Sequence, residues 1–254
     1  MSQPKTPSPT SGLDLERLYS PDGHHLGSLF SGTSGSGKTT AIISTLQAAI
    51  ASKKFGEWHR FILIDPKGQP GDYDLLGDAL FDVDSVFQSI RKNRVTVFWP
   101  AMDLMEEEVS AVIDYTFDLA DSEPRTTFTF VLDEAAMLIT PTRMPLSLKR
   151  LSVQGRSRRI MPVYASQRPL LNRWTDANLS NMFLFRTLPL DADQLSRRWG
   201  VDFEEADARL REKPYSFIWF NMEDASMTPL EPVALPKQPA KPKRGIKSRI
   251  RDLI

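Results

Sequence analysis

Eight consecutive residues near the start of the chain have the types and spacing of a phosphate-binding loop. The segment Gly32-Thr33-Ser34-Gly35-Ser36-Gly37-Lys38-Thr39 fits G-x-x-x-x-G-K-[ST] at every position. Glycines let the backbone N–H groups turn toward phosphate oxygens, and a following helix adds the positive potential of its N-terminus. The Lys38 ammonium then reaches the β- and γ-phosphates, and the Thr39 hydroxyl is placed to ligate Mg²⁺. We expect Gly32 to Thr40 to bind a nucleoside triphosphate.

A second motif supplies two carboxylates. The apolar run 128–132 ends directly in Asp133 and Glu134. Asp133 is expected to hold Mg²⁺ through its water shell, together with Thr39, and Glu134 to polarise the water that attacks the γ-phosphate. A single Asp would suit a switch GTPase or a nucleotide kinase, whereas the Asp-Glu pair indicates an ATPase that uses hydrolysis for motion. The intact pair also argues against a scaffold that binds ATP without hydrolysing it.

A third motif, Tyr164-Ala165-Ser166-Gln167-Arg168-Pro169, follows another expected strand. If this strand neighbours the strand before the phosphate-binding loop, the Gln167 amide lies beside the γ-phosphate. Gln167 would then sense ATP and transmit its state to a bound substrate. A glutamine at the end of a strand is otherwise an ordinary turn residue, so its role depends on strand order.

The elements that position these motifs alternate along the chain. Strands are expected at 24–30, 60–64, 95–99, 126–132, 160–165, 182–186 and 215–220. Helices are expected after the phosphate-binding loop, from an N-cap at Asp103, and over 146–158; the second has Val109, Val112, Ile113 and Phe117 on one face. Alternation of this kind predicts an α/β fold with a mostly parallel central sheet covered by helices.

Composition excludes several classes of protein. The chain has 254 residues, 41% of them hydrophobic and 25% charged, which is typical of a globular protein and not of a disordered or fibrous one. It has no cysteine and three histidines, so neither a disulfide framework nor a zinc site is expected. No apolar run approaches the roughly 20 residues needed to span a bilayer. We therefore expect a cytoplasmic protein without a transmembrane segment.

The charge is balanced overall but not along the chain. The net charge is zero, yet residues 233–254 carry seven basic residues and one acidic residue. This basic tail is expected to meet either DNA phosphates or, through Ile246, Ile250, Leu253 and Ile254 at helical spacing, a protein surface. Residues 1–20 are rich in Pro, Ser and Thr and are expected to form a flexible arm. One ATPase domain is expected over 21–232.

Over residues 24–190 the chain resembles the FtsK/HerA superfamily of P-loop ATPases that translocate DNA. The matching features, in order, are the loop at 32–39, Asp65-Pro66-Lys67-Gly68, Leu132-Asp133-Glu134-Ala135, and Gly155-Arg156 followed by Ala165-Ser166-Gln167-Arg168-Pro169. Within the superfamily it looks most like the compact genome-packaging ATPases of tailless viruses with an internal membrane. The resemblance implies a RecA-like fold, ATP and Mg²⁺ as ligands, and packaging of double-stranded DNA into a procapsid in the host cytoplasm, with a capsid vertex or portal-like partner and association with the virion.

The resemblance also implies a homo-oligomeric ring, commonly a hexamer, with nucleotide between subunits. An arginine of one subunit then stabilises charge at the neighbour's site. Arg156 is the first candidate for this residue and Arg186, on a later strand, the second. Two alternatives stay open: a conjugation or chromosome-handling motor, and a P-loop small-molecule or nucleotide kinase. The kinase would need a mobile Arg-rich lid, for which 150–159 is the one candidate segment.

Overall fold

The computed structural model describes residues 27–52 and 55–234. The strands are β1 (Ser28–Ser31), β2 (His59–Ile64), β3 (Ala79–Leu80), β4 (Val95–Phe98), β5 (Thr127–Leu132), β6 (Ile160–Ser166), β7 (Asn181–Leu184), β8 (Phe217–Asn221) and β9 (Ser226–Leu230). The α-helices are α1 (Lys38–Ala51), α2 (Val83–Lys92), α3 (Met105–Ser122), α4 (Leu146–Gln154), α5 (Arg173–Asp176), α6 (Pro189–Trp199) and α7 (Phe203–Glu212). The predicted arm at 1–20 and the tail beyond residue 234 lie outside the described residues.

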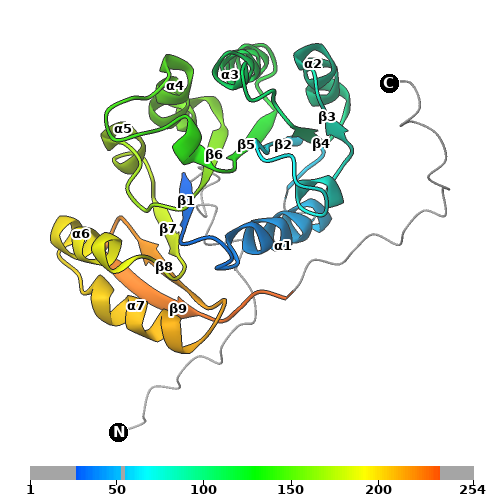
Figure 1. Cartoon of the computed structure of the whole chain (residues 1–254). Helices are drawn as coiled ribbons and strands as arrows, with labels where there is room; N and C mark the ends of the chain where they lie inside the picture. Colours follow the sequence, from blue (N-terminus) through cyan, green and yellow to red (C-terminus); the bar gives the residue numbers. More distant parts are fainter. Residues whose placement is uncertain (1–26, 53–54, 235–254) are drawn as a thin grey trace, which may run out of the picture.

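The strands form one sheet in the order β3-β4-β2-β5-β6-β1-β7-β8-β9 (Figure 1). Pairing is parallel from β3 through β7 and antiparallel for β8 and β9. The prediction of a mostly parallel sheet covered by helices is confirmed. Among the described helices, none is both long and apolar enough to cross a bilayer.

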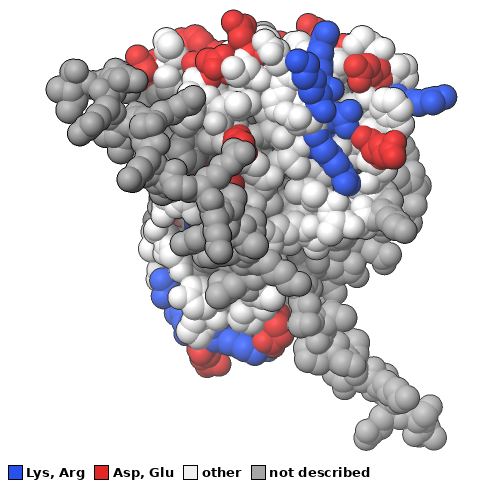
Figure 2. All heavy atoms as spheres, turned by 90° about the vertical axis from the view of Figure 1, so that its right-hand side faces the viewer, with Lys and Arg blue, Asp and Glu red and all other residues white. Residues whose placement is uncertain are grey.

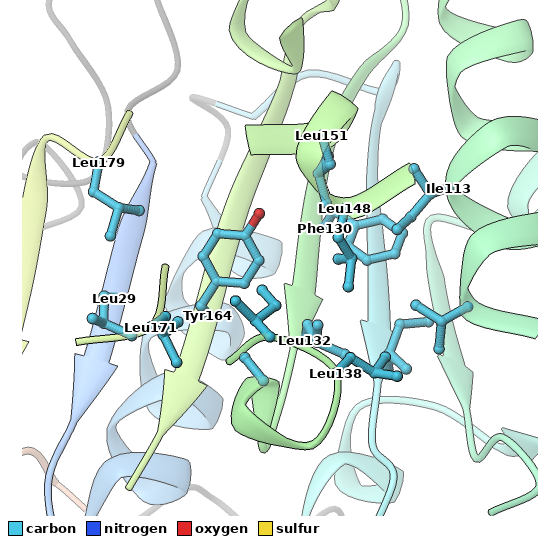
Figure 3. Packing of buried hydrophobic residues seen from close by; sticks show 14 of the residues in the cluster. Leu29, Ile113, Phe130, Leu132, Leu138, Leu148, Leu151, Tyr164, Leu171 and Leu179 are labelled. Carbon is cyan, nitrogen blue, oxygen red and sulfur yellow. The ribbon is translucent and has the colours of Figure 1, made fainter. Parts of the chain in front are cut away.

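Two apolar clusters cover the two faces of the sheet. Helix α1 packs on one face, which is why Ile42, Ile43 and Leu46 are buried. Helices α2, α3 and α4 pack on the other, where the predicted apolar stripe of α3 is buried at all four positions. Figure 3 shows Phe130 and Tyr164 of the central strands beneath Leu148 and Leu151 of α4. Each such side chain contributes roughly 1.5–3 kcal/mol through burial.

Two predicted helix boundaries are wrong. Helix α3 begins after Leu104 and not at Asp103, and no side chain caps it; instead the Glu108 carboxylate accepts a hydrogen bond from the Ala101 N–H, 2.8 Å away. The helix expected over 146–158 ends at Gln154 and continues as a 3₁₀ turn over Arg156–Arg158. Gly155 stands between the two, where an added Cβ would lie 2.4 Å from the Leu151 carbonyl oxygen.

The strand that precedes the phosphate-binding loop is central in the sheet. Strand β1 pairs with β6 on one side and β7 on the other, with Ser31 opposite Ser166 and Leu184. Because these strands and β2 and β5 are all parallel, their carboxyl ends meet at one edge. Each predicted site residue that follows a strand therefore lies at this edge, which we call the catalytic edge.

Candidate active site

The phosphate-binding loop is closed on itself by its own lysine. Lys38 is buried, and its Nζ donates hydrogen bonds to the carbonyl oxygens of Gly32 at 2.7 Å and Thr33 at 3.0 Å. The glycine before it, Gly37, has φ +102°, a conformation that side chains with a Cβ rarely adopt. Burial lowers the pKa of Lys38, and the negative charges of Glu134 and Asp133 oppose that effect. The loop thus presents a cation and the N-terminus of α1 to one space.

That space is a cavity of about 340 Å³ at the catalytic edge. Its walls are Ser34 to Thr40, Lys67, Gln69, Asp72, Glu134 and Tyr215. The loop residues predicted to bind nucleotide therefore share one cavity with the predicted base, apart from Gly32 and Thr33, which lie behind it. The Gly32 carbonyl oxygen accepts a hydrogen bond from Lys38 Nζ, and the Thr33 N–H donates to the Arg186 carbonyl oxygen 2.8 Å away. These two residues anchor the loop.

The Asp133–Glu134 pair lies at the end of β5, and both side chains are buried. The Asp133 carboxylate accepts a hydrogen bond from the Glu134 N–H at 2.8 Å. Burial raises the pKa of Asp133, and the positive charge of Lys67 opposes the rise. Glu134 has φ +44°, so the chain turns sharply there and directs the two carboxylates differently. Backbone strain of this kind is concentrated at functional sites.

Two side chains from neighbouring strands hold Glu134. Gln167 follows β6, and its Nε2 lies 3.2 Å from Glu134 Oε1. Lys67, which follows β2, forms an ion pair with the same carboxylate. Burial acts to lower the pKa of Lys67, but the hydrogen bond to Glu134 and the charge of Asp133 outweigh it, so its pKa is raised. The strand adjacency required for the sensor role of Gln167 is present.

Sequence reasoning used Lys67 only as part of a resemblance and assigned it no contact. The sequence cue for this contact is the Asp-Pro-Lys-Gly segment, whose residues are typical of a turn. In the structure the Asp65 carboxylate accepts a hydrogen bond from the Lys67 N–H at 3.1 Å, and Gly68 has φ +56°. An added Cβ on Gly68 would lie 3.1 Å from the Trp99 ring. The Asp-Pro-Lys-Gly segment is therefore a rigid turn that aims Lys67 at Glu134.

The donor set fits a hydrated magnesium ion. Buried oxygen atoms near the carboxylates, Asp65 Oδ2, Tyr73 Oη and Ser36 Oγ, have no hydrogen-bond partner within the described part of the chain. Across 27–52 and 55–234 no group of three or more His, Cys, Asp or Glu is arranged as a metal cage. Magnesium is usually held by one or two carboxylates, substrate phosphates and water, so one hydroxyl and one carboxylate suffice. Thr39 and Asp133 remain the predicted ligands.

The arginine cluster before β6 lies at the edge of the sheet opposite the phosphate-binding loop. Arg158 forms an ion pair with Asp121 at 2.7 Å, and Arg159 donates to the carbonyl oxygens of Thr126 and Ala120. Arg156 is exposed, and its guanidinium forms no ion pair or hydrogen bond with the residues the structure describes. Of these three guanidinium groups, that of Arg156 is therefore available to a neighbouring molecule.

Arg186 lies in a different place. It follows β7 at the catalytic edge, is exposed, and forms no ion pair within the described ranges. With Gly35 and Ser36 it borders a second cavity, of about 200 Å³. Arg186 is thus beside the phosphate-binding loop of its own subunit, whereas Arg156 is remote from it.

The fold is that of a RecA-like P-loop protein, and the phosphate-binding loop and the Asp133–Glu134 pair lie at one edge of its sheet. No protein-family model matches the chain, and no curated protein matches it by sequence. Solved structures do match. The genome packaging NTPase B204 from Sulfolobus turreted icosahedral virus 2, in complex with AMP, has a TM-score of 0.61 at 17% identity, covering 82% of this chain and 98% of that chain.

Two further solved structures match the chain. VirB4 of Thermoanaerobacter pseudethanolicus has a TM-score of 0.58 at 11% identity, covering 83% of this chain and 90% of that one. The bacterial conjugative coupling protein TrwBΔN70 has a TM-score of 0.60 at 10% identity, covering 85% and 86%. The chain shares its fold with these proteins, and the RecA-like α/β fold that its motifs predicted is confirmed.

Proposed function

We propose that this chain is an ATP-driven translocase that packages double-stranded viral DNA into a procapsid. The observation that carries the proposal is the convergence of the phosphate-binding loop, Glu134, Lys67 and Gln167 on one edge of a sheet with this fold. The likeness to a viral packaging NTPase over 98% of that chain supports the packaging branch. A capsid vertex or portal-like partner, a host-cytoplasmic location and association with the virion belong to the same proposal.

Each residue of the site has a role in hydrolysis. Glu134 takes a proton from the attacking water, and Lys38 neutralises charge on the β- and γ-phosphates. Bound to Thr39 and Asp133, Mg²⁺ supplies Lewis-acid stabilisation of the phosphate oxygens. Gln167 connects the γ-phosphate position to Glu134 through its amide. Arg156 completes the site of the next subunit in a ring, which is the role that its unpaired, exposed guanidinium supports.

The segment that a kinase would need as a mobile Arg-rich lid, 150–159, is held by contacts with α3. Arg150 forms an ion pair with Asp114 at 3.3 Å and packs over the Phe117 ring, and Arg158 is paired with Asp121. This segment is bound to α3 and ends at the edge of the sheet away from the phosphate-binding loop. It is not built to close over an acceptor phosphate.

A conjugation or chromosome-handling motor is the second candidate, because VirB4 and TrwB match the fold about as well as the packaging NTPase does. Both candidates predict ATP hydrolysis that duplex DNA stimulates, and a kinase predicts none. ATPase measurements with and without duplex DNA therefore test the translocase proposal, and no stimulation would contradict it. Packaging of DNA into purified procapsids separates the two motors, because only the packaging proposal predicts it.

Figure 2 shows basic side chains of the described residues in a short stripe near acidic side chains at the upper part of the view, and again near acidic side chains at its lower end. The proposed DNA contacts are the basic residues of the tail. The tail proposal concerns residues outside the described ranges and is tested by salt dependence below.

A further inference from the structure

The turn between α7 and β8 carries an aromatic ring to the phosphate-binding loop. Tyr215 is 61% exposed and borders both cavities at the catalytic edge, the 340 Å³ cavity on one side and the 200 Å³ cavity on the other. An added Cβ on Gly37 would lie 3.4 Å from Tyr215 Cδ1, so the ring is in van der Waals reach of the loop. A large side chain thus stands open to solvent at the rim of the site.

The backbone holds this ring in place at a cost. Tyr215 has φ +64°, a left-handed conformation that a bulky residue rarely adopts. The turn is fixed by hydrogen bonds from Ser216 to the Lys213 carbonyl, the side-chain one at 2.6 Å, and by an ion pair between Lys213 and Glu231. The next residue, Phe217, is buried and stacks on Phe185 with ring centroids 4.8 Å apart. Several contacts therefore hold the turn in its strained conformation, as is typical of strained residues at ligand-binding sites.

The two cavities differ in chemistry. The larger contains the groups that handle phosphate, Lys38 and Glu134. The smaller shares Gly35, Ser36 and Tyr215 with it and adds apolar walls from Leu210 and Pro214, with Arg186 and Arg211 at its border. Arg211 is already paired with Asp207 at 2.7 Å, whereas Arg186 is not paired within the described residues. A triphosphate whose γ-end lies at Glu134 therefore has an aromatic and apolar surface beside it, next to Gly35 and Ser36 of the loop.

We propose that Tyr215 is the stacking platform for the nucleobase of the bound nucleoside triphosphate, with Leu210 and Pro214 as apolar walls beside it. An exposed π-face held rigidly next to a phosphate site suits a planar heterocycle, because the ring gives up little conformational freedom on binding. The inference rests on the proposed function only for the binding of a triphosphate by the loop. It requires neither hydrolysis nor DNA.

The test separates base binding from phosphate binding. The dissociation constants of ATP and of inorganic tripolyphosphate, each with Mg²⁺, are measured by calorimetry for the full chain and for Tyr215→Phe, Tyr215→Ala and Tyr215→Gly. Loss of base–aromatic stacking weakens binding on the order of tenfold. We expect this loss for ATP in the Ala and Gly variants, unchanged tripolyphosphate affinity in both, and retained ATP affinity in the Phe variant. The Gly variant adopts φ +64° without strain, so its loss reports the ring itself.

Trp174→Ala is the matched control, because Trp174 is another exposed aromatic residue and lies on α5, away from both cavities. It should bind both ligands like the wild type. Unchanged ATP affinity in Tyr215→Ala, or equal weakening of ATP and tripolyphosphate, would overturn the stacking role. Failure of the proposed function has a different signature: a wild-type chain that binds neither ligand, or one that binds both with the expected difference and shows no DNA-stimulated hydrolysis.

Discussion

Replacing Glu134 by Gln isolates the general base from the structure around it. The amide keeps the length and shape of the side chain, and its oxygen still accepts hydrogen bonds from Lys67 and Gln167. The variant loses only the negative charge and the ability to take a proton. Removal of a general base typically lowers turnover by about 10²-fold or more, which corresponds to roughly 2.7 kcal/mol of activation free energy.

The effect on stability is expected to be much smaller. The ion pair of Glu134 involves Lys67, whose side chain is 38% exposed and so retains access to water when the charge is removed. The Glu134 side chain is only 9% exposed, but Gln keeps an oxygen that accepts from Lys67, so we expect a loss of about 1 kcal/mol, the upper end for exposed pairs. For a chain of this length, that corresponds to a shift in Tm of about 2–4 °C. A melting shift within that range shows that the hydrolysis defect does not come from unfolding.

The assay is phosphate release at saturating ATP, together with the Kd for ATP and a thermal melt. Glu106→Gln is the matched control, because Glu106 is an exposed glutamate that pairs with Arg143 outside the site. We expect Glu134→Gln to bind ATP with little change and to turn over about 10²-fold more slowly, while Glu106→Gln behaves like the wild type. Wild-type turnover in Glu134→Gln would refute the assigned role, and so would loss of ATP binding equal to the loss of turnover.

Three other predictions follow from the same geometry. Lys38→Ala should weaken ATP binding itself, since it removes both the phosphate contact and the hydrogen bonds that close the loop; unchanged Kd would contradict this. Arg156→Ala subunits should bind ATP without hydrolysing it and regain activity when mixed with Glu134→Gln subunits, whereas Arg158→Ala should hydrolyse normally; no rescue in rings shown to mix would exclude Arg156 in trans. Deletion from Leu235 should make the slope of log K against log salt shallower by about 4 to 5 units if the tail contacts DNA phosphates, and an unchanged slope would assign the tail to protein docking.

Local signals were sufficient for the parts of the site that follow strands. The phosphate-binding loop, Asp133, Glu134 and Gln167 each come directly after an apolar run, so their common edge follows from a parallel sheet. Strand order is not local, and the contact between Gln167 and Glu134 depends on β6 lying between β5 and β1. The sequence therefore predicted that Gln167 joins the site only on the condition that its strand neighbours the strand before the phosphate-binding loop.

Other features had no usable signal. Strand β3 has two residues, and no residue of β9 is fully buried, so neither has the apolar pattern of a buried strand. Tyr215 belongs to no motif. Its left-handed backbone is held by the hydrogen bonds of Ser216 and by the stacking of Phe217 on Phe185, the residue after β7. The N-cap prediction at Asp103 failed by one residue: Leu104 occupies the N-cap of α3, and no side chain caps it.

The central position of β1 has a consequence for biosynthesis. Its pairing partners, β6 and β7, lie more than 130 residues later in the chain, and the loop itself is tied down by the bond from the Thr33 N–H to the Arg186 carbonyl. Contacts of such sequence separation form late, because the intervening chain must first be closed into a loop. On the ribosome the phosphate-binding loop is thus translated early and completed only after residue 186 has emerged. A growing chain therefore cannot complete the proposed ATP site before most of the domain has been made.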